Sequence, residues 1–464
     1  MTTQHGVQDA PEGVFSLLDT DLYKLTMQNA IFKFFPDVQV AYRFTNRTKD
    51  MHLNTAAYEW LQRQIAKLEN ITITSHEIHF LAEHCPYLTP EFLIFLKSFR
   101  LHPKTQVELE FQPVSDGSDE GDISLSVKGR WLDTILYEIP LLALVSESYF
   151  KFVDTDWDHA SQAQNAKAKG LALMEAGCVF SEFGSRRRRD YHTHELVMQG
   201  LVDAQKEAHD KGLKGKLAGT SNVHFAMKYG VNPVGTVAHE WFMGIAAILN
   251  DYTKANETAL QYWIGTFGRG TLSIALTDTF GTPNFLEAFK RHAPPDYMLD
   301  PHASEPPPNP MYAAIFTGTR QDSGSPTEFV KLMKNFYEQQ GIKDRKSIVF
   351  SDSLNVEKCI EYKKITDQAG LIPSFGVGTF FTNDFVRKTT GHKSVPLNIV
   401  IKLSEAEGRP AVKISDNLGK NTGDSHEVAR VKRELGYVEK DWEGGDESSR
   451  WGKDSDLSKA RPHS

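Results

Sequence analysis

The sequence predicts an α/β protein in which an irregular βα barrel follows an N-terminal α+β domain. Two patterns support this prediction. From about residue 170 onwards, short apolar runs are each followed by a helical stretch, which is typical of parallel βα units. Before that point, apolar and polar side chains alternate in several segments, as they do in half-buried antiparallel strands. The length of 464 residues fits one large barrel and a smaller companion domain.

The first 150 residues mix strand and helix patterns. In residues 38–47, Val40, Tyr42 and Phe44 share one face, which predicts a half-buried strand. We therefore predict an α+β domain with an antiparallel sheet over residues 1–150. Further strands are predicted at 107–111 and 123–131, and helices at 55–70 and 133–150.

Residues 151–396 repeat a strand–helix rhythm. Each strand candidate is a short apolar run that ends in small or polar residues, and residues 329–336 carry the apolar stripe of an amphipathic helix. The spacing suits a βα barrel, in which function is expected where strands end and loops begin. The apolar runs lie at 178–180, 217–218, 234–237, 272–276, 313–316, 348–350 and 373–377.

The C-terminal part contains three different segments. Residues 294–310 hold seven prolines, which predicts a surface loop between barrel units. Residues 397–415 predict a β-hairpin around positions 407–408, and we expect residues 397–440 to return to the first domain. The charged, Gly/Ser-rich segment 441–464 is expected to be a mobile tail.

The composition excludes several classes of function. The net charge of −8 does not favour nucleic-acid binding, so anionic ligands would have to be attracted by local basic groups. No apolar stretch approaches about 18 residues, which argues against a membrane span. Residues 1–13 lack a signal-peptide pattern. The three cysteines show no metal-binding spacing, and we expect a reducing compartment, the cytoplasm or also the nucleus.

Candidate site residues follow the first two apolar runs of the barrel. Phe183 can stack on a flat heterocycle, and Arg186 can hold a carboxylate or phosphate with two hydrogen bonds. Arginines continue to position 189, so a solvated basic turn or a nuclear-import-like patch is the alternative. Thr220 and Ser221 can bind an anion at a helix start, although an ordinary N-cap is the more common explanation.

His239 ends the third apolar run, with the carboxylate of Glu240 beside it. Such a histidine can act as an acid, a base or a phosphoryl acceptor, although a lone histidine is more often structural. Asp278 can orient a histidine or hold a metal-bound water, and a plain strand-end turn is equally favoured. Further on, Arg320 can pair with a carboxylate, and Asp322 can accept from two adjacent sugar hydroxyls.

The last candidates follow the final two runs. Asp352 follows one of them, and Gly376, Gly378 and Thr379 form a turn in which the backbone can approach a phosphate closely. The sequence has no GxxxxGK[ST] loop, so ATP is not bound in the P-loop manner. Near the N-terminus, Tyr23 stands in a motif before a helix, and the residues alone favour a packed core tyrosine.

Together these motifs resemble the nicotinate phosphoribosyltransferase family. The matching segments run in a consistent order from residue 20 to 379 and so cover most of the chain. Nicotinamide phosphoribosyltransferases share much of this pattern, whereas quinolinate phosphoribosyltransferases share the fold but are shorter. The segments are TDLYKLTM, FSEFGSRRRR, GTSN, GTVAHEW, LTDTFG, TRQDSG, FSDSLN and FGVGT.

The resemblance implies the type II phosphoribosyltransferase fold and a homodimer with shared active sites. It implies that nicotinate is joined to 5-phosphoribosyl 1-diphosphate, with coupling to ATP hydrolysis, in the salvage route of NAD biosynthesis. In that pattern Tyr23 comes from the partner subunit and stacks on nicotinate opposite Phe183. His239 becomes a phosphohistidine that Glu240 or Asp278 orients.

The resemblance also implies ligand contacts for the remaining candidates. Mg²⁺ would arrive with the substrate phosphates. Two alternatives stay open, a nicotinamide-specific enzyme and a non-catalytic barrel scaffold. In the implied contacts, Arg186 and Arg320 face the nicotinate carboxylate or phosphates, Asp322 holds the ribose hydroxyls, Gly376, Gly378 and Thr379 hold the 5′-phosphate, and Asp278 and Asp352 support the ribose, the diphosphate or its Mg²⁺.

Overall fold

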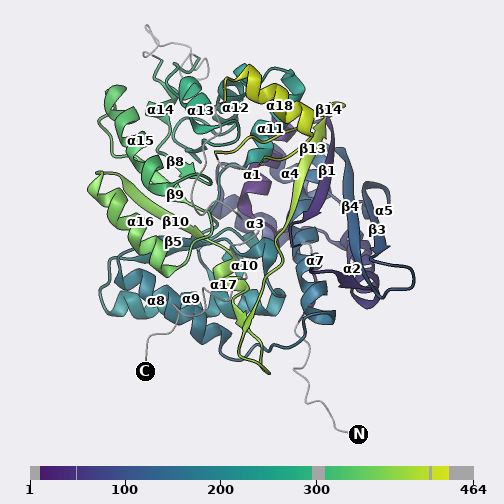
Figure 1. The fold of residues 1–464 in the computed structure, drawn as a ribbon. Coiled ribbons are helices and arrows are strands. Elements are labelled where there is room, and N and C mark those ends of the chain that lie inside the picture. Colours follow the sequence, from purple (N-terminus) through teal and green to yellow (C-terminus); the bar gives the residue numbers. More distant parts are fainter. Residues whose placement is uncertain (1–10, 49, 295–308, 417–420, 438–464) are drawn as a thin grey trace.

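Two sheets organise the chain in a computed structural model, which describes residues 11–48, 50–294, 309–416 and 421–437 (Figure 1). One sheet is antiparallel and the other is parallel, as the α/β class with an N-terminal α+β part requires. Most of the predicted loop at 294–310 and the whole predicted tail at 441–464 lie outside the described residues.

The antiparallel sheet has the strand order β14–β13–β1–β4–β2, and β3 also pairs with β4. Strand β13 enters this sheet from the far end of the sequence, so that Leu403 lies opposite Tyr42 of β1. The predicted hairpin is present: Glu407 and Gly408 turn the chain with φ values of 51° and 70°, the left-handed conformation that tight hairpins need. The strands are β1 (Gln39–Asn46), β2 (Leu53–Asn54), β3 (Val107–Pro113), β4 (Glu120–Arg130), β13 (Ile399–Ala406) and β14 (Arg409–Pro410).

Helices accompany this sheet, and the helix predicted at 133–150 is interrupted. It starts as the short α6 (Trp131–Thr134), passes through a 3₁₀ turn at Ile135–Tyr137, and continues as α7 (Glu138–Phe152). Pro140 lies in the first turn of α7, where its missing N–H breaks no helical hydrogen bond. The other helices are α2 (Thr55–Lys67), α3 (Ser75–His84), α4 (Pro90–Ser98) and α5 (Pro103–Gln106).

The parallel sheet has the order β6–β5–β10–β9–β8–β7, and every neighbouring pair is parallel. Among the described residues no ladder joins β6 to β7, so the sheet is an irregular, open barrel rather than a hydrogen-bonded closed one. Because all its strands are parallel, their carboxyl ends lie at the same edge of the sheet. They are β5 (Val179–Glu182), β6 (Lys216–Thr220), β7 (Ile274–Leu276), β8 (Gly318–Gln321), β9 (Ser347–Phe350) and β10 (Ile372–Val377).

Two of the predicted barrel strands are wrong. Residues 234–237 form no strand; Gly235 has φ 159° and packs against the backbone of Tyr23, where a side chain would not fit well. Residues 313–316 fall mostly in the short helix α14 (Tyr312–Ile315), and β8 begins just after it. A four-residue apolar run does not distinguish a buried strand from a helical turn, and tertiary packing decides.

Helices connect and cover the parallel strands (Figure 1). Within the described ranges, none of the helices has the length and apolar character needed to cross a bilayer. Besides α1 (Leu22–Phe34), the remaining helices of the described chain are α8 (Gln162–Glu175), α9 (Tyr191–Asp210), α10 (Val223–Tyr229), α11 (His239–Leu249), α12 (Tyr252–Phe267), α13 (Thr282–Phe289), α15 (Pro326–Gln339), α16 (Val356–Gln368), α17 (Thr379–Thr382) and α18 (Ser425–Glu434); a small ribbon pairs β11 (Phe385–Val386) with β12 (Lys393–Ser394).

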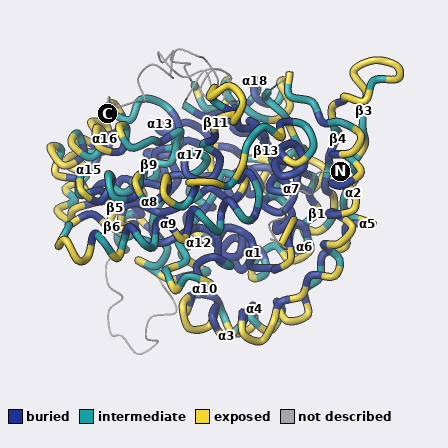
Figure 2. The backbone as a smooth tube through the Cα atoms, turned by 90° about the horizontal axis from the view of Figure 1, so that it is seen from below, coloured by how far each residue is buried: buried dark blue, intermediate teal, exposed yellow. Residues whose placement is uncertain are grey.

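The first helix, α1 (Leu22–Phe34), lies in the interior (Figure 2). It is buried at every position from Leu22 to Ile31, so it is an interior helix. One of its two lysines, Lys24, is fully buried and forms ion pairs with Glu138 and Glu240. Because α1 is enclosed by the rest of its own chain, the residues at its start are held firmly against the barrel.

Candidate active site

One pocket of about 220 Å³ collects most of the predicted site residues. It lies at the carboxyl edge of the parallel sheet and is faced on its other side by β13 of the antiparallel sheet. This is the edge at which ligands bind in parallel α/β folds. Predicted residues that line it are Tyr23, Phe183, Arg186, His239, Glu240, Arg320, Asp322, Asp352, Gly376, Gly378 and Thr379.

Tyr23 enters the pocket from the same chain. The segment before α1 is tied to the barrel, because Leu22 N–H donates to the Ser221 carbonyl (2.7 Å) and Ser185 donates to the Asp21 carboxylate (2.6 Å). The expectation that Tyr23 is supplied by a partner subunit is therefore corrected. Burial, together with the nearby Glu138 carboxylate, raises the pKa of Tyr23 well above its ordinary value, so the phenol stays neutral.

Thr220 and Ser221 do not line the pocket. Both are fully buried; the Thr220 hydroxyl donates to Glu182 (2.5 Å) and the Ser221 hydroxyl donates to Asp21 (2.7 Å). Their prediction as substrate ligands is corrected, because the Thr220 hydroxyl is used inside the barrel and the Ser221 hydroxyl fastens the N-terminal segment to the barrel. The helix N-cap at this place is Asn222, whose side chain accepts from the Phe225 N–H.

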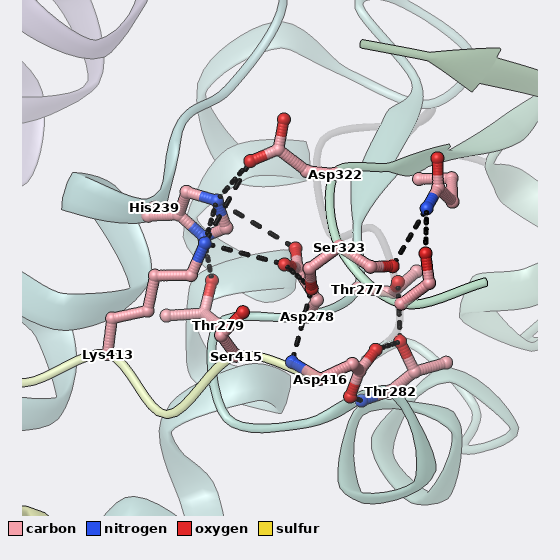
Figure 3. Close-up of polar contacts among 12 residues, drawn as sticks. His239, Thr277, Asp278, Thr279, Thr282, Asp322, Ser323, Lys413, Ser415 and Asp416 are labelled. Carbon is pink, nitrogen blue, oxygen red and sulfur yellow. Dashed lines mark hydrogen bonds and ion pairs between the residues drawn. The ribbon is translucent and has the colours of Figure 1, made fainter. Parts of the chain in front are cut away.

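His239 is the first residue of α11 and is held at both ring nitrogens (Figure 3). Nδ1 lies 3.0 Å from the Thr279 hydroxyl, on the buried side, and Nε2 lies 2.9 Å from Oδ2 of Asp322. The ammonium of Lys413 is 2.8 Å from the same Nε2. Asp278 is close, at 3.8 Å, but Thr279 and Asp322 make the orienting hydrogen bonds.

The electrostatics of the pocket keep this imidazole neutral. Burial and then the Lys413 ammonium lower the pKa of His239 to about 4, against the opposing carboxylates. Asp322 behaves in the opposite way: burial alone would raise its pKa, but Arg320, His239 and Lys413 hold it well below the ordinary range. At neutral pH the pocket therefore contains a neutral imidazole beside an ionised carboxylate.

Glu240 does not orient His239, although the two are adjacent. Its carboxylate accepts hydrogen bonds from Lys24, from the Tyr42 hydroxyl (2.6 Å) and from the Trp131 indole (2.7 Å). Successive residues on a helix point about 100° apart, so His239 faces the strand ends while Glu240 faces α1. The expectation that Glu240 orients His239 is therefore wrong, and a catalytic role for Glu240 itself stays a prediction.

Lys413 is a site residue that the sequence did not single out. It lies shortly after the hairpin of the antiparallel sheet, and its side chain is only 5% exposed. A lysine in the segment VKIS has no strand-end motif to mark it. The one usable signal was its position in the segment predicted to return to the first domain.

The arginine run divides into pocket and core residues. Arg186 lines the pocket and lies 3.7 Å from Glu138. Arg188 is buried and makes two 2.7 Å hydrogen bonds to Asp19, and Arg189 is buried against the Phe150 ring. Neither of the two buried guanidinium groups is available as part of a solvated basic turn or an import signal.

Arg320 and the glycine turn complete the wall of the pocket. Arg320 donates to Asp322 (2.7 Å) and to the Ser351 hydroxyl (2.8 Å), which fixes its guanidinium group at the strand ends. A side chain at Gly378 would come within 2.9 Å of the Phe183 carbonyl, so the turn needs glycine to pack on the Phe183 loop. The roles of these groups toward a ligand stay predictions.

Three neighbouring groups, two in the pocket and Asp278 buried beside it, have metal-ligand chemistry. Ligand atoms of His239, Asp278 and Asp322 lie within 4.8 Å of one another. However, the Lys413 ammonium is 3.4 Å from Asp278 and 3.9 Å from Asp322, so a cation already occupies the space between the carboxylates. This trio does not fit a resident Mg²⁺ ion, which prefers several oxygen ligands and water in an open octahedron.

The pocket is rich in cations although the chain is acidic overall. Against the net charge of −8, basic side chains from both sheets face this pocket. Such a local positive field attracts anions and concentrates them at the site. The basic residues are Arg47, Arg186, Arg187, Arg320, Lys402 and Lys413.

A neutral, partly buried histidine among cations and ionised carboxylates at the edge of a parallel sheet defines a class of protein, the α/β enzymes that act on phosphorylated small molecules. The chain belongs to the nicotinate phosphoribosyltransferase (NAPRTase) family, whose profile matches residues 178–439, and the profile of the family's N-terminal domain matches residues 18–146.

Relatives match nearly the full chain. A nicotinate phosphoribosyltransferase of Saccharomyces cerevisiae is 46% identical over 441 residues, 94% of this chain and 98% of the relative. One of Methanosarcina mazei is 39% identical, covering 88% and 95%. A crystal structure from S. cerevisiae, provisionally assigned as a nicotinate phosphoribosyltransferase, superimposes with a TM-score of 0.86 at 45% identity, covering 92% and 100%. The nicotinate phosphoribosyltransferase of Vibrio cholerae gives 0.78 at 32% identity, covering 93% and 96%.

Proposed function

We propose that the chain joins nicotinate to 5-phosphoribosyl 1-diphosphate, giving nicotinate mononucleotide and diphosphate in the salvage route of NAD biosynthesis. The names of its relatives suggest this activity. The observation that carries the proposal is one pocket that combines aromatic rings, several cations and a partly buried histidine. A flat anionic base and a phosphorylated sugar both find matching groups there.

In the proposed reaction, the pyridine nitrogen of nicotinate forms a bond to ribose C1 while the bond from C1 to the diphosphate oxygen breaks. Tyr23 and Phe183 align the flat ring, which lowers the entropy cost of bringing the nitrogen to C1. Arg186 lies in the same pocket and is suited to the carboxylate of the base. Neutral aromatic walls on the ring and a cation for its carboxylate together favour nicotinate.

The transition state carries positive charge on the sugar and negative charge on the departing diphosphate. The ionised carboxylate of Asp322 stabilises the first, and the cations that line the pocket stabilise the second. Arg320 is already oriented by Asp322 and Ser351, so it needs no rearrangement as the charge develops. Pre-oriented charges of this kind contribute most to catalysis in buried sites.

ATP use is proposed to pass through His239. The geometry supports Nε2 as the nitrogen that attacks the terminal phosphorus, because Nδ1 is turned toward the buried Thr279 while Nε2 meets pocket residues. The bond from that phosphorus to ADP breaks as the bond to Nε2 forms. The attack uses the neutral tautomer whose proton is on Nδ1 and is donated to the Thr279 hydroxyl, so that Nε2 carries the lone pair, and the Lys413 ammonium would balance the charge of the phosphohistidine.

Mg²⁺, a homodimer and a cytoplasmic or also nuclear location remain predictions for this chain. We propose that Mg²⁺ comes bound to the substrate phosphates. A dimer is not required for Tyr23, since the pocket receives that side chain from its own chain. We propose that the sites are accordingly independent even if the protein dimerises.

The test is mononucleotide formation from 5-phosphoribosyl 1-diphosphate with nicotinate or with nicotinamide, each with and without ATP. We expect turnover of nicotinate that ATP stimulates, and we expect His239→Asn to remove the stimulation while leaving nicotinate binding. Preferred turnover of nicotinamide would place the chain with the nicotinamide-specific enzymes. No turnover of either base would favour the non-catalytic scaffold.

A further inference from the structure

A second cavity, of about 400 Å³, lies between the starts of helices α13 and α15 and residues 435–437. None of its lining residues also lines the active-site pocket. Its walls are largely apolar and include Phe280, Phe329, Leu332 and Tyr437. Cavities of this size and character hold small organic molecules in other proteins.

The charge of this second cavity is opposite to that of the active-site pocket. Its lining includes the carboxylates of Glu328 and Asp416, and no lysine, arginine or histidine is among the described residues that line it. The Asp416 carboxylate therefore disfavours anions such as nicotinate, the sugar diphosphate and ATP, whereas the charge of Glu328 is partly balanced by the exposed Lys331 (2.9 Å). A neutral molecule with N–H donors is favoured, because carboxylates only accept hydrogen bonds when ionised.

The second cavity is connected to His239 through the segment 413–416 (Figure 3). Asp416 lines the cavity, and its backbone N–H donates to the Ser323 hydroxyl (3.1 Å), which donates in turn to Asp278. Three residues before Asp416, Lys413 reaches the imidazole of His239.

Between these two residues stands Ser415, in a left-handed conformation with φ 65°. The hydroxyl of Tyr437, a cavity residue, holds the Ser415 carbonyl (2.7 Å). A non-glycine residue in this conformation is kept there by its surroundings. Movement of Tyr437 or Asp416 would therefore be passed to the backbone that carries Lys413.

We propose that this cavity is an effector site for a neutral heteroaromatic carboxamide, which on binding shifts the segment 413–416 and changes the contact between Lys413 and His239. The ring fills the apolar walls, and the amide N–H groups face the carboxylates of Asp416 and Glu328. Binding to the cavity does not depend on the proposed function; only an effect on turnover rests on it.

The test uses calorimetric titration of the full chain with nicotinamide and, separately, with nicotinate, two ligands of equal size that differ in charge. Leu332→Trp fills the cavity from α15, and Ile360→Trp makes the same change on α16, where the residue is similarly exposed and lines neither cavity. We expect Leu332→Trp to weaken nicotinamide at least tenfold, Ile360→Trp to leave it unchanged, and both to keep nicotinate binding.

The coupling is read from the ¹⁵N resonances of the His239 imidazole, assigned by their loss in His239→Asn. Nicotinamide is expected to shift them in the native chain and in Ile360→Trp, but not in Leu332→Trp. No nicotinamide binding, or equal binding by all three proteins, overturns the site; binding without the shift overturns the coupling.

A second variant and the nicotinate titration separate the effector site from the proposed function. Should Leu332→Trp fail to fold, Glu328→Trp fills the same cavity from an exposed position. If nicotinamide binds as expected but nicotinate does not, the proposed function fails while the effector site stands.

Discussion

The imidazole of His239 lies among charges that compete for its protonation. Burial and the Lys413 ammonium disfavour the imidazolium form, whereas the carboxylates of Asp278 and Asp322 favour it. The first pair prevails, and the pKa falls from 6.5 to about 4. A ring kept neutral throughout the physiological range is suited to act as a nucleophile, since its lone pair is always available.

Replacement of Lys413 by alanine should raise the pKa of His239 toward 6.5. The sign follows from the charge: removing a cation next to Nε2 makes the positively charged imidazolium less unfavourable. The pKa is measured by NMR titration of the ring nitrogens. Lys413→Arg keeps the charge and should keep the low pKa. An unchanged pKa in Lys413→Ala would mean that burial alone sets it.

Glu240, the neighbour of His239, is expected to stabilise the fold. Its buried carboxylate, 8% exposed, pairs with Lys24 and accepts from Tyr42 and Trp131. Glu240→Ala leaves these donors without an acceptor, although Lys24 keeps Glu138. We expect the free energy of unfolding to fall by about 3 kcal/mol.

Urea unfolding measures this loss, and NMR should find the pKa of His239 unchanged in the same variant. Glu108→Ala, which removes an exposed partner of Lys128, should leave the unfolding midpoint where it is. A shifted pKa of His239 in Glu240→Ala would show that Glu240 acts on His239 and would support a catalytic role for Glu240.

Helix α11 is the element that links the site to the core. It carries His239 at its first position, and Gly244 one and a half turns later packs against Trp131. A Cβ atom at Gly244 would lie 2.4 Å from the Trp131 ring, which is much closer than van der Waals contact. The same Trp131 donates to Glu240, so this contact fixes how α11 sits beside α1.

Gly244→Ala should therefore destabilise the fold by about 1–3 kcal/mol in spite of the higher helix propensity of alanine. Gly265→Ala in α12 is the matched control, because Gly265 is exposed and its Cβ would meet only the Phe34 ring, at 3.3 Å. We expect that change to be neutral or slightly stabilising. The unfolding temperatures of the two variants are compared by thermal unfolding. Equal unfolding temperatures would refute the packing argument for Gly244.

Elements with a strong local signal were predictable from the sequence. The alternation in residues 38–47 identified β1, and the Glu407–Gly408 turn identified the hairpin. The pocket residues that directly follow strands were also predictable, since parallel strands bring their ends to one edge. Arg320 and Asp322 at the end of β8 are examples.

What the sequence did not reveal depends on tertiary packing. Glu240 follows His239 directly, yet the direction of each side chain is set only when α11 docks between the sheets. Thr220 has the right residue type for anion binding, but its hydroxyl is used by the buried Glu182. Lys413 reaches His239 across 174 positions of sequence, a contact that no local pattern records.

At the scale of the whole molecule, the chain encloses its own N-terminal helix and thereby completes its own pocket. Helix α1 is buried between the barrel and the N-terminal elements, and Tyr23 at its start faces Phe183 and Arg186 across one pocket. The bonds from Asp21 to Ser185 and Ser221 close this arrangement within one chain. The number of subunits and the completeness of the site are therefore separate questions.

This separation predicts that inactive variants do not complement one another. We expect Tyr23→Ala and Asp322→Asn to be strongly impaired in mononucleotide formation, and a co-refolded mixture of the two to be no more active than either alone. If Tyr23 came instead from a partner, half of the mixed dimers would contain one intact site, and about a quarter of native activity would return. A mixture of His239→Asn with Asp322→Asn is the control, because both changes lie in the barrel and cannot complement in either arrangement. Because Tyr23 lines the pocket of its own chain, each variant polypeptide keeps its own defect whatever it associates with.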